Sequence, residues 1–148
     1  MLIKRKNCCI IGKNTYLSIP KKFRPLKDRL NIVLTHNIEQ FKKEFNDELV
    51  ILFSSLENAL EYLKPKENIE NVFVIGGAQV YKEAIENVNC KKIYLTKILD
   101  SKQEYICDIY FPKNFTKNFK KSFFNDQRDT EIYKDCGIDF TYNLYEKI

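Results

Sequence analysis

Several residue types and patterns are scarce in this chain of 148 residues, and each scarcity excludes a class of protein. No apolar run approaches the roughly 20 residues of a membrane-spanning helix, so we expect no membrane partner. His36 is the single histidine and no Cys-x-x-Cys pair occurs, so no metal site is expected. With four glycines, four prolines and no Gly/Ser-rich linker, the chain is not collagen-like, and its length predicts one domain over residues 1–148.

The residues that are present are typical of a globular protein, with 44% hydrophobic and 30% charged residues. The net charge of +5 is spread along the sequence, which suits anionic ligands without indicating a nucleic-acid partner. Five scattered cysteines without a recognisable signal peptide predict reduced thiols and a cytoplasmic location. Cys8 and Cys9 lie in an apolar run and are predicted to fill the core.

The apolar pattern predicts an α/β fold. Buried strands are expected at residues 8–11, 30–34, 49–53 and 71–75. Helices are expected at residues 12–18, 39–44, 56–63 and 78–87. Buried strands joined by helices are typical of a parallel sheet. Three later strands without intervening helices are expected at residues 93–98, 119–125 and 139–145, with a turn at 135–137. The prediction is a mixed, mostly parallel sheet flanked by helices, closed by an antiparallel C-terminal hairpin.

Two strand-to-helix junctions contain glycine. Residues 11–15 read Ile-Gly-Lys-Asn-Thr, and residues 74–81 contain the pair Gly76-Gly77 directly after a strand. Glycine, exposed N–H groups and a lysine charge at such junctions favour a phosphate group. The alternatives are a plain turn at the first junction and a purely conformational glycine pair at the second. Neither is the Rossmann pattern G-x-G-x-x-G, but two junctions in one parallel sheet favour a ligand site, because ligands bind at the carboxyl ends of the strands.

The segment between these junctions combines apolar and basic residues. Ile19, Phe23 and Leu26 could line an apolar cleft that ends at Arg29, whose guanidinium suits a carboxylate. The alternative is a solvated basic loop, which is the commoner meaning of such charge.

Six segments together resemble dihydrofolate reductase in order and spacing. They are residues 11–20, 24–29, 31–35, 73–81, 94–98 and 107–112, and they span nearly the whole chain. The resemblance implies the fold of that family and the NADPH-dependent reduction of 7,8-dihydrofolate to tetrahydrofolate in one-carbon metabolism. Residues 20–23 and 105–108 look most like the protozoan branch.

The resemblance also implies roles for individual residues. Those matching the NADPH site are Gly12, Lys13, Asn14, Thr15, Leu34, Thr35, His36, Gly76, Gly77, Ala78, Gln79, Val80 and Tyr81. Those matching the dihydrofolate site are Ile19, Phe23, Leu26, Arg29, Ile75, Tyr81 and Thr96. In the family the Gly-Gly peptide is cis and the threonine matched by Thr96 supports the catalytic acid. This chain has His36 where the family often has Arg, Tyr16 where it has Trp, and Asp28 where it has Gly.

The largest departure lies at the beginning of the sequence. The family begins with a central strand, a mobile loop and a helix that carries the catalytic Asp or Glu, and this sequence starts beyond them. No residue therefore matches the acid, and Glu39, Glu44 and Asp47 are expected to face solvent. We expect the first central strand to be absent, its neighbours to have unpaired edges, and the chain alone to be inactive or poorly folded. Either the gene model has lost its first segment, or a separate N-terminal segment completes the fold.

Two other functions stay open at this point. The chain could be a non-catalytic NADPH-binding remnant, or a related NADPH reductase such as the pyrimidine reductase of riboflavin synthesis. The segment 24–29 and the ending Tyr-Glu-Lys at 145–147 favour the folate enzyme over the second alternative.

Overall fold

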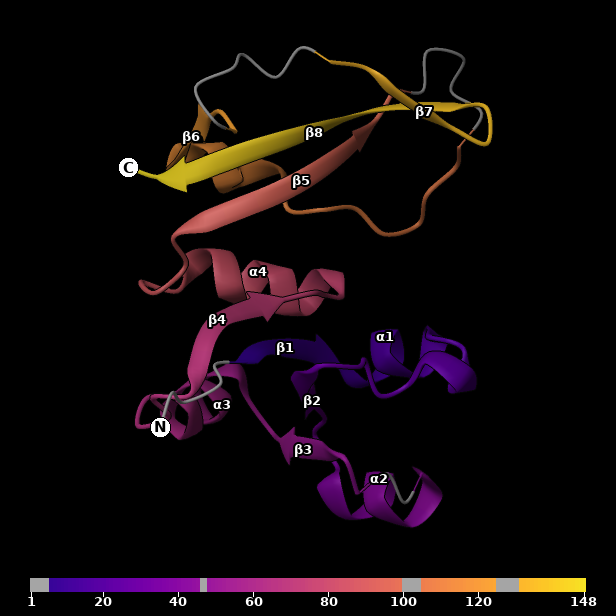
Figure 1. Ribbon diagram of the computed structural model, residues 1–148, viewed down its shortest axis with the longest axis vertical. Coiled ribbons are helices and arrows are strands. Elements are labelled where there is room, and N and C mark those ends of the chain that lie inside the picture. The colour runs from indigo at the N-terminus through magenta and orange to yellow at the C-terminus, as the bar shows by residue number, and fades with distance from the viewer. Residues whose placement is uncertain (1–5, 46–47, 100–104, 125–130) are drawn as a thin grey trace. The chain divides into compact units, whose positions relative to one another are not determined.

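The computed structural model describes residues 6–45, 48–99, 105–124 and 131–148. The chain forms two compact units, which divide between Ala84 and Ile85. The first unit contains a parallel sheet with its helices, and the second contains an antiparallel sheet (Figure 1). We describe each unit by itself.

The sheet of the first unit has the strand order β3-β2-β1-β4, with every pair parallel. The strands are β1 (Lys6–Gly12), β2 (Arg29–Leu34), β3 (Val50–Phe53) and β4 (Ile69–Val74). In the register Ile10 lies opposite Ile32 of β2 and Val74 of β4. The parallel sheet that the strand-helix alternation predicts is confirmed.

Among the described residues, three α-helices connect these strands and a fourth follows β4, and together they cover both faces of the sheet. They are α1 (Lys13–Ser18), α2 (Ile38–Phe45), α3 (Leu56–Leu63) and α4 (Ala78–Glu86), and a 3-10 helix η1 (Lys21–Phe23) follows α1. The α3 helix begins where the Ser55 side chain accepts a hydrogen bond from the Asn58 N–H (3.2 Å), as an N-cap does.

Successive residues of β1 enter two different cores, because side chains alternate between the faces of a strand. Ile10 packs with Leu56 of α3, whereas Ile11 packs with Tyr16 of α1 and Phe41 of α2. Cys8 and Cys9 are both buried, which confirms their expected place in the core.

The burial that we expected for the strand at residues 71–75 is wrong. The strand β4 exists, but most of its residues are exposed, and Val72 and Phe73 keep 40% and 39% of their surface accessible. The physical reason is position: β4 is the edge of its sheet and pairs only with β1 among the described strands.

The second unit is antiparallel around its last strand. The long strand β8 (Ile138–Lys147) pairs with β5 (Lys92–Ile98), β6 (Phe119–Ser122) and β7 (Tyr133–Asp135). The turn between β7 and β8 has positive φ at Cys136 (48°) and Gly137 (81°), so the expected C-terminal hairpin is confirmed. The core of the second unit contains Ile93 and Phe119. This unit also contains a 3-10 helix η2 (Lys113–Lys117), which was not expected.

Two differences from the expected sheet follow. The described parallel strands and the described antiparallel strands form two sheets, whereas one mixed sheet was expected. The strand expected at 119–125 ends at Ser122, and Asn125 lies outside the described residues. None of the described helices is both long and apolar enough to cross a membrane.

Candidate functional site

The two glycine-containing junctions lie next to each other in the first unit. The Gly12 N–H donates a hydrogen bond to the Gly76 carbonyl oxygen (2.7 Å), and the Ile75 N–H donates one to the Ile10 oxygen (2.9 Å). These bonds extend the pairing of β1 and β4 to the carboxyl ends of both strands. The structure thus brings the two junctions together at this edge of the sheet.

The junctions are packed too closely for larger residues. A Cβ atom added at Gly77 would lie 2.8 Å from the Thr15 Oγ1, and one at Gly12 would lie 3.2 Å from the Val80 Cγ2. Gly76 has a φ of +102°, and an added Cβ there would lie 3.1 Å from the Tyr81 ring. Glycine at these positions therefore allows two segments from distant parts of the sequence to pack against each other.

The Gly76-Gly77 peptide bond is cis, as the family resemblance implies. The helix α4 starts directly after it, and the Tyr81 N–H donates to the Gly77 oxygen (2.9 Å). The Tyr81 side chain is half-buried, and burial raises the pKa of its hydroxyl.

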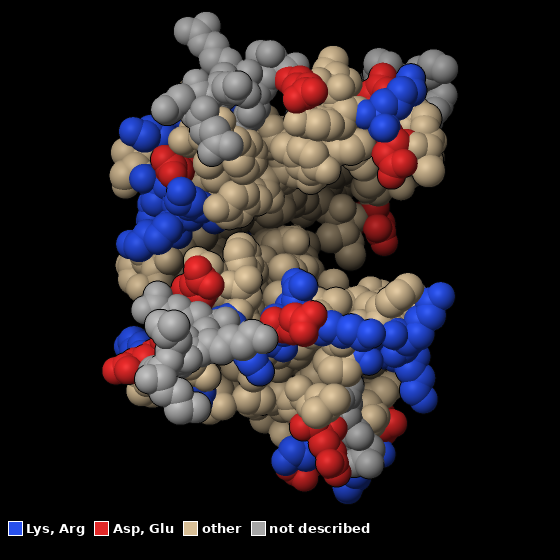
Figure 2. Space-filling view, in the orientation of Figure 1, with Lys and Arg blue, Asp and Glu red and all other residues tan. Residues whose placement is uncertain are grey.

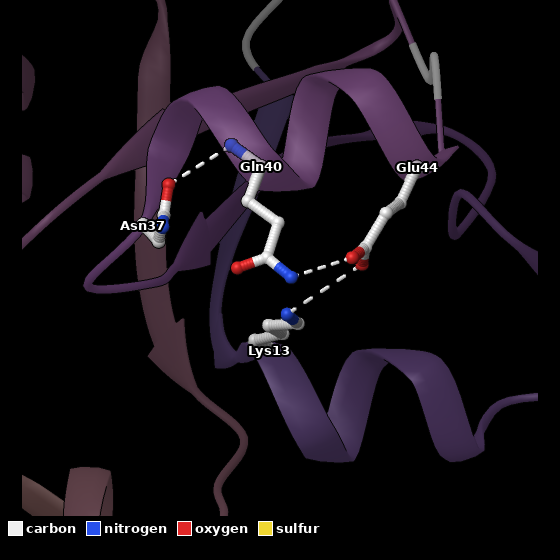
Figure 3. Close-up of polar contacts among 4 residues, drawn as sticks. All are labelled: Lys13, Asn37, Gln40 and Glu44. Atoms are coloured by element: carbon white, nitrogen blue, oxygen red, sulfur yellow. Dashed lines mark hydrogen bonds and ion pairs between the residues drawn. The ribbon is translucent and has the colours of Figure 1, made fainter.

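Lys13 extends from the start of α1 towards α2, where Figure 3 shows a small polar network. The Lys13 Nζ lies 3.9 Å from the Glu44 Oε2, and the Gln40 Nε2 donates to the Glu44 Oε1 (2.6 Å). The Asn37 Oδ1 accepts a hydrogen bond from the Gln40 N–H (2.9 Å) at the start of α2.

The acids expected to face solvent are exposed where the structure describes them. Glu39 pairs with Lys42 (3.6 Å) and keeps 79% of its side chain exposed, while Glu44 keeps 42% exposed. Asp47 lies outside the described residues. The pairing of Glu44 with Lys13 was not foreseen, because nothing in the sequence relates the end of α2 to the start of α1.

The remaining NADPH candidates differ in what their side chains contact. Leu34 and Val80 are buried in the core, so only their backbone could reach a ligand. Thr35 is also buried, and its N–H donates to the Phe53 oxygen (2.9 Å). The exposed members are Asn14, His36 and Gln79, while Ala78 is partly buried. Basic side chains gather on the part of the first unit that contains α1 (Figure 2).

The dihydrofolate candidates of the first unit lie around the segment 19–29. Ile19 and Ile75 are partly buried and pack against the same core cluster. Phe23 is exposed (57%). Arg29 is also exposed, and its Nε donates to the Lys27 oxygen (3.0 Å).

Asn31 is a positioning residue that sequence reasoning missed. Its side chain is buried, accepts a hydrogen bond from the Leu26 N–H (3.0 Å), and donates to the oxygens of Leu26 (2.8 Å) and Arg29 (3.1 Å). These bonds fix the backbone of two substrate candidates to β2. The sequence feature that could have indicated this role is the polar residue inside the apolar run Leu-Asn-Ile-Val-Leu.

Thr96 is the one candidate in the second unit, on β5 opposite Tyr142, and it is exposed. No Asp or Glu is buried among the residues that the structure describes; the buried polar residues there are Asn31, Thr35 and Asn143. A carboxyl group that works as a general acid usually owes its raised pKa to burial. The described residues thus offer no buried acid, and they contain no group of three or more His, Cys, Asp or Glu that could hold a metal.

The fold and the site together define a class: an α/β protein whose glycine junctions meet at the carboxyl edge of a parallel sheet, as in proteins that bind nucleotides. Comparison with known proteins is more specific. The family model of dihydrofolate reductase matches residues 3–147. The chain therefore belongs to the dihydrofolate reductase family, whose members are NADP-dependent oxidoreductases. The resemblance stated from the sequence is confirmed at the level of the family.

Individual relatives agree with this assignment. Dihydrofolate reductase of Heliothis virescens is 39% identical over 142 residues, covering 96% of this chain and 74% of the relative. That of Aedes albopictus is 37% identical over 147 residues, covering 97% of this chain and 75% of the relative. The structure of Schistosoma mansoni dihydrofolate reductase superimposes with a TM-score of 0.79 at 33% identity, covering 98% of this chain and 76% of that chain. The likeness to the protozoan branch stays a prediction.

Proposed function

We propose that the protein catalyses the NADPH-dependent reduction of 7,8-dihydrofolate to tetrahydrofolate, and that NADPH binds where the two glycine junctions meet. Family membership supports the reaction. The observation that carries the site is the hydrogen bond from the Gly12 N–H to the Gly76 oxygen (2.7 Å), which joins both junctions at the carboxyl edge of the sheet. The five free cysteines are consistent with a cytoplasmic location.

The side chains around this edge suit a phosphorylated dinucleotide. Lys13 supplies a positive charge, and Asn14, Thr15 and His36 supply hydrogen-bonding groups on the same edge. NADPH supplies the hydride when bound, while these residues hold its phosphates. The Tyr81 ring lies against Gly76, and we propose that it contacts the nicotinamide end of the cofactor.

The neighbouring segment suits the folate. Ile19 and Ile75 share one apolar cluster, which offers a wall for an aromatic ligand next to the glycine junctions. The exposed guanidinium of Arg29 can form a bidentate pair with a carboxylate of the glutamate tail. Asn31 fixes the backbone on which this arginine stands.

We also propose that an extended N-terminal segment pairs along the outer edge of β4 and brings the catalytic acid. Strands of parallel sheets are usually covered on both faces, and exposed apolar edges are a hazard that proteins avoid. Val72 and Phe73 point to opposite faces of β4, and each keeps about two fifths of its surface accessible. An added strand would pair the backbone of β4 and cover both side chains.

The test is the oxidation of NADPH by dihydrofolate, followed by nicotinamide absorbance, on the purified chain. The assay is run alone, with an N-terminal segment from a related reductase, and with a scrambled version of that segment. We expect the native segment to raise turnover by about 10²–10⁴-fold, the usual contribution of a positioned general acid. The scrambled segment should raise it little.

Each outcome separates the parts of the proposal. Equal turnover without the segment would mean that an acid within the chain serves, and the pairing along β4 would be wrong. No turnover under any condition, with NADPH bound, would mean a non-catalytic nucleotide-binding protein. Neither turnover nor NADPH binding would contradict the proposed function itself.

A further inference from the structure

Lys13 and Glu44 form a link between two helices that both start at the carboxyl edge of the sheet. The Lys13 Nζ lies 3.9 Å from the Glu44 Oε2, and the two side chains keep 28% and 42% of their surface exposed. Lys13 is the charged member of the first glycine junction. The anion beside the Lys13 ammonium is thus a carboxylate of α2, as Figure 3 shows.

The carboxylate of Glu44 is held in place by its own helix. Its Oε1 accepts a hydrogen bond from the Gln40 Nε2 (2.6 Å), which leaves Oε2 towards Lys13. The centroid of the adjacent Phe45 ring lies 6.0 Å from the Lys13 Nζ, so a second side chain of α2 lies beside the lysine. Glu39, the other acid of α2, lies at the start of that helix and pairs with Lys42 instead (3.6 Å).

We propose that Glu44 limits the affinity for the cofactor by competing with one of its phosphate groups for Lys13. This inference rests on the proposed NADPH site. A phosphate that approaches Lys13 must displace the carboxylate or share the ammonium with it, and two anions close together repel each other. Because the pair is partly exposed, the competition lowers the affinity for the cofactor without blocking it.

The test compares Glu44→Gln with Glu39→Gln, a matched control that removes the same charge from the same helix. The dissociation constants of NADPH, NADH and inorganic pyrophosphate are measured by titration at low and high salt. We expect Glu44→Gln to bind NADPH about two- to fivefold more tightly than wild type at low salt, the range that an exposed ion pair allows. The gain should shrink at high salt, and Glu39→Gln should change the affinity less than about 1.5-fold.

The titration with NADH identifies which phosphate group of the cofactor Lys13 contacts. A gain confined to NADPH assigns Lys13 to the 2′-phosphate, and an equal gain for NADH assigns it to the diphosphate; both support the competition. Equal affinities of Glu44→Gln and Glu39→Gln would overturn it. If neither the wild type nor either variant binds NADPH, the proposed function fails. The pyrophosphate titration then decides the inference alone. Tighter pyrophosphate binding by Glu44→Gln supports the competition, and no difference or no binding overturns it.

Discussion

At the scale of single residues, the closest fit in the first unit is between Gly77 and Thr15. The missing Cβ of Gly77 would lie 2.8 Å from the Thr15 Oγ1, closer than real Cβ contacts permit. Thr15 is β-branched, so rotation about χ1 replaces the hydroxyl with another group and cannot clear the space freely. The packing of the two junctions therefore depends on the size of one side chain.

This fit predicts the behaviour of Gly77→Ala. We expect the free energy of unfolding to fall by about 1–3 kcal/mol, the usual cost of overpacking. Thr15→Ala removes the atom that the new methyl group meets, so the double variant should be more stable than the sum of the single effects predicts. The measurement is a double-mutant cycle by urea unfolding. Strictly additive effects would contradict the proposed clash.

The sequence indicated candidate site residues, but it did not indicate the residues that they contact. The glycines and Lys13 stand out because their residue types and places beside a strand carry a chemical meaning. The contacts Gly77–Thr15 and Lys13–Glu44 depend on how segments far apart in sequence are placed in space. Periodicity within one segment holds no information on that placement.

At the scale of elements, β2 fixes the loop that precedes it. The Asn31 side chain donates hydrogen bonds to the Leu26 and Arg29 oxygens and accepts one from the Leu26 N–H. The residue is only 2% exposed, so these groups are shielded from water. Buried backbone groups that lose such a partner cost free energy, because water cannot replace it. One strand residue thus orders two proposed substrate contacts: Leu26 in the loop and Arg29 at the start of β2.

We predict that Asn31→Ala lowers the free energy of unfolding by about 2 kcal/mol or more. It should also raise the KM for dihydrofolate more than it lowers kcat, because Leu26 and Arg29 lose their fixed backbone. The control is Asn71→Ala, since Asn71 is an exposed strand asparagine that bonds to Asn7 at the surface (3.3 Å). It should change stability by less than about 0.5 kcal/mol. Equal effects of the two substitutions would argue against the assigned role.

Elements with a strong local pattern were predicted well. The apolar spacing predicted the bounds of α3, Leu56–Leu63, because this signal lies within the helix itself. The burial of β4 was predicted wrongly, since an apolar sequence does not say whether a strand lies inside a sheet or at its edge. The short elements η2 and β7 carry no periodic signal and were missed.

At the scale of the whole molecule, buried and partly buried thiol and phenol groups make the free energy of unfolding depend on pH in the alkaline range. Burial, with the neighbouring Cys9, raises the pKa of the Cys8 thiol from 9.0 to about 12. Burial also raises the pKa of Tyr81 and of Cys90. In each case the folded state keeps the proton more strongly than the unfolded state, so stability is complete below the unfolded pKa and falls as the pH rises.

We therefore predict that the free energy of unfolding declines as the pH rises from about 9 towards 12, with Cys8 contributing at most about 1.4 kcal/mol per pH unit. Cys8→Ala should be less stable at neutral pH, because it leaves a small cavity, but should show a shallower alkaline decline. The exposed Cys107 serves as the control, and Cys107→Ala should follow the wild-type curve. Parallel alkaline curves for Cys8→Ala and wild type would refute the assignment.

The hydrogen bond between Gly12 and Gly76 also bears on the order of folding events. It joins the end of the first described strand to the residues that follow the fourth, so the long intervening chain must fold back before the bond can form. Contacts between such distant residues form slowly, since the chain must first close a long loop. A nascent or partly folded chain thus has both glycine motifs but no site. Nucleotide binding would therefore report that β4 has joined β1, and not merely that the first helices have formed.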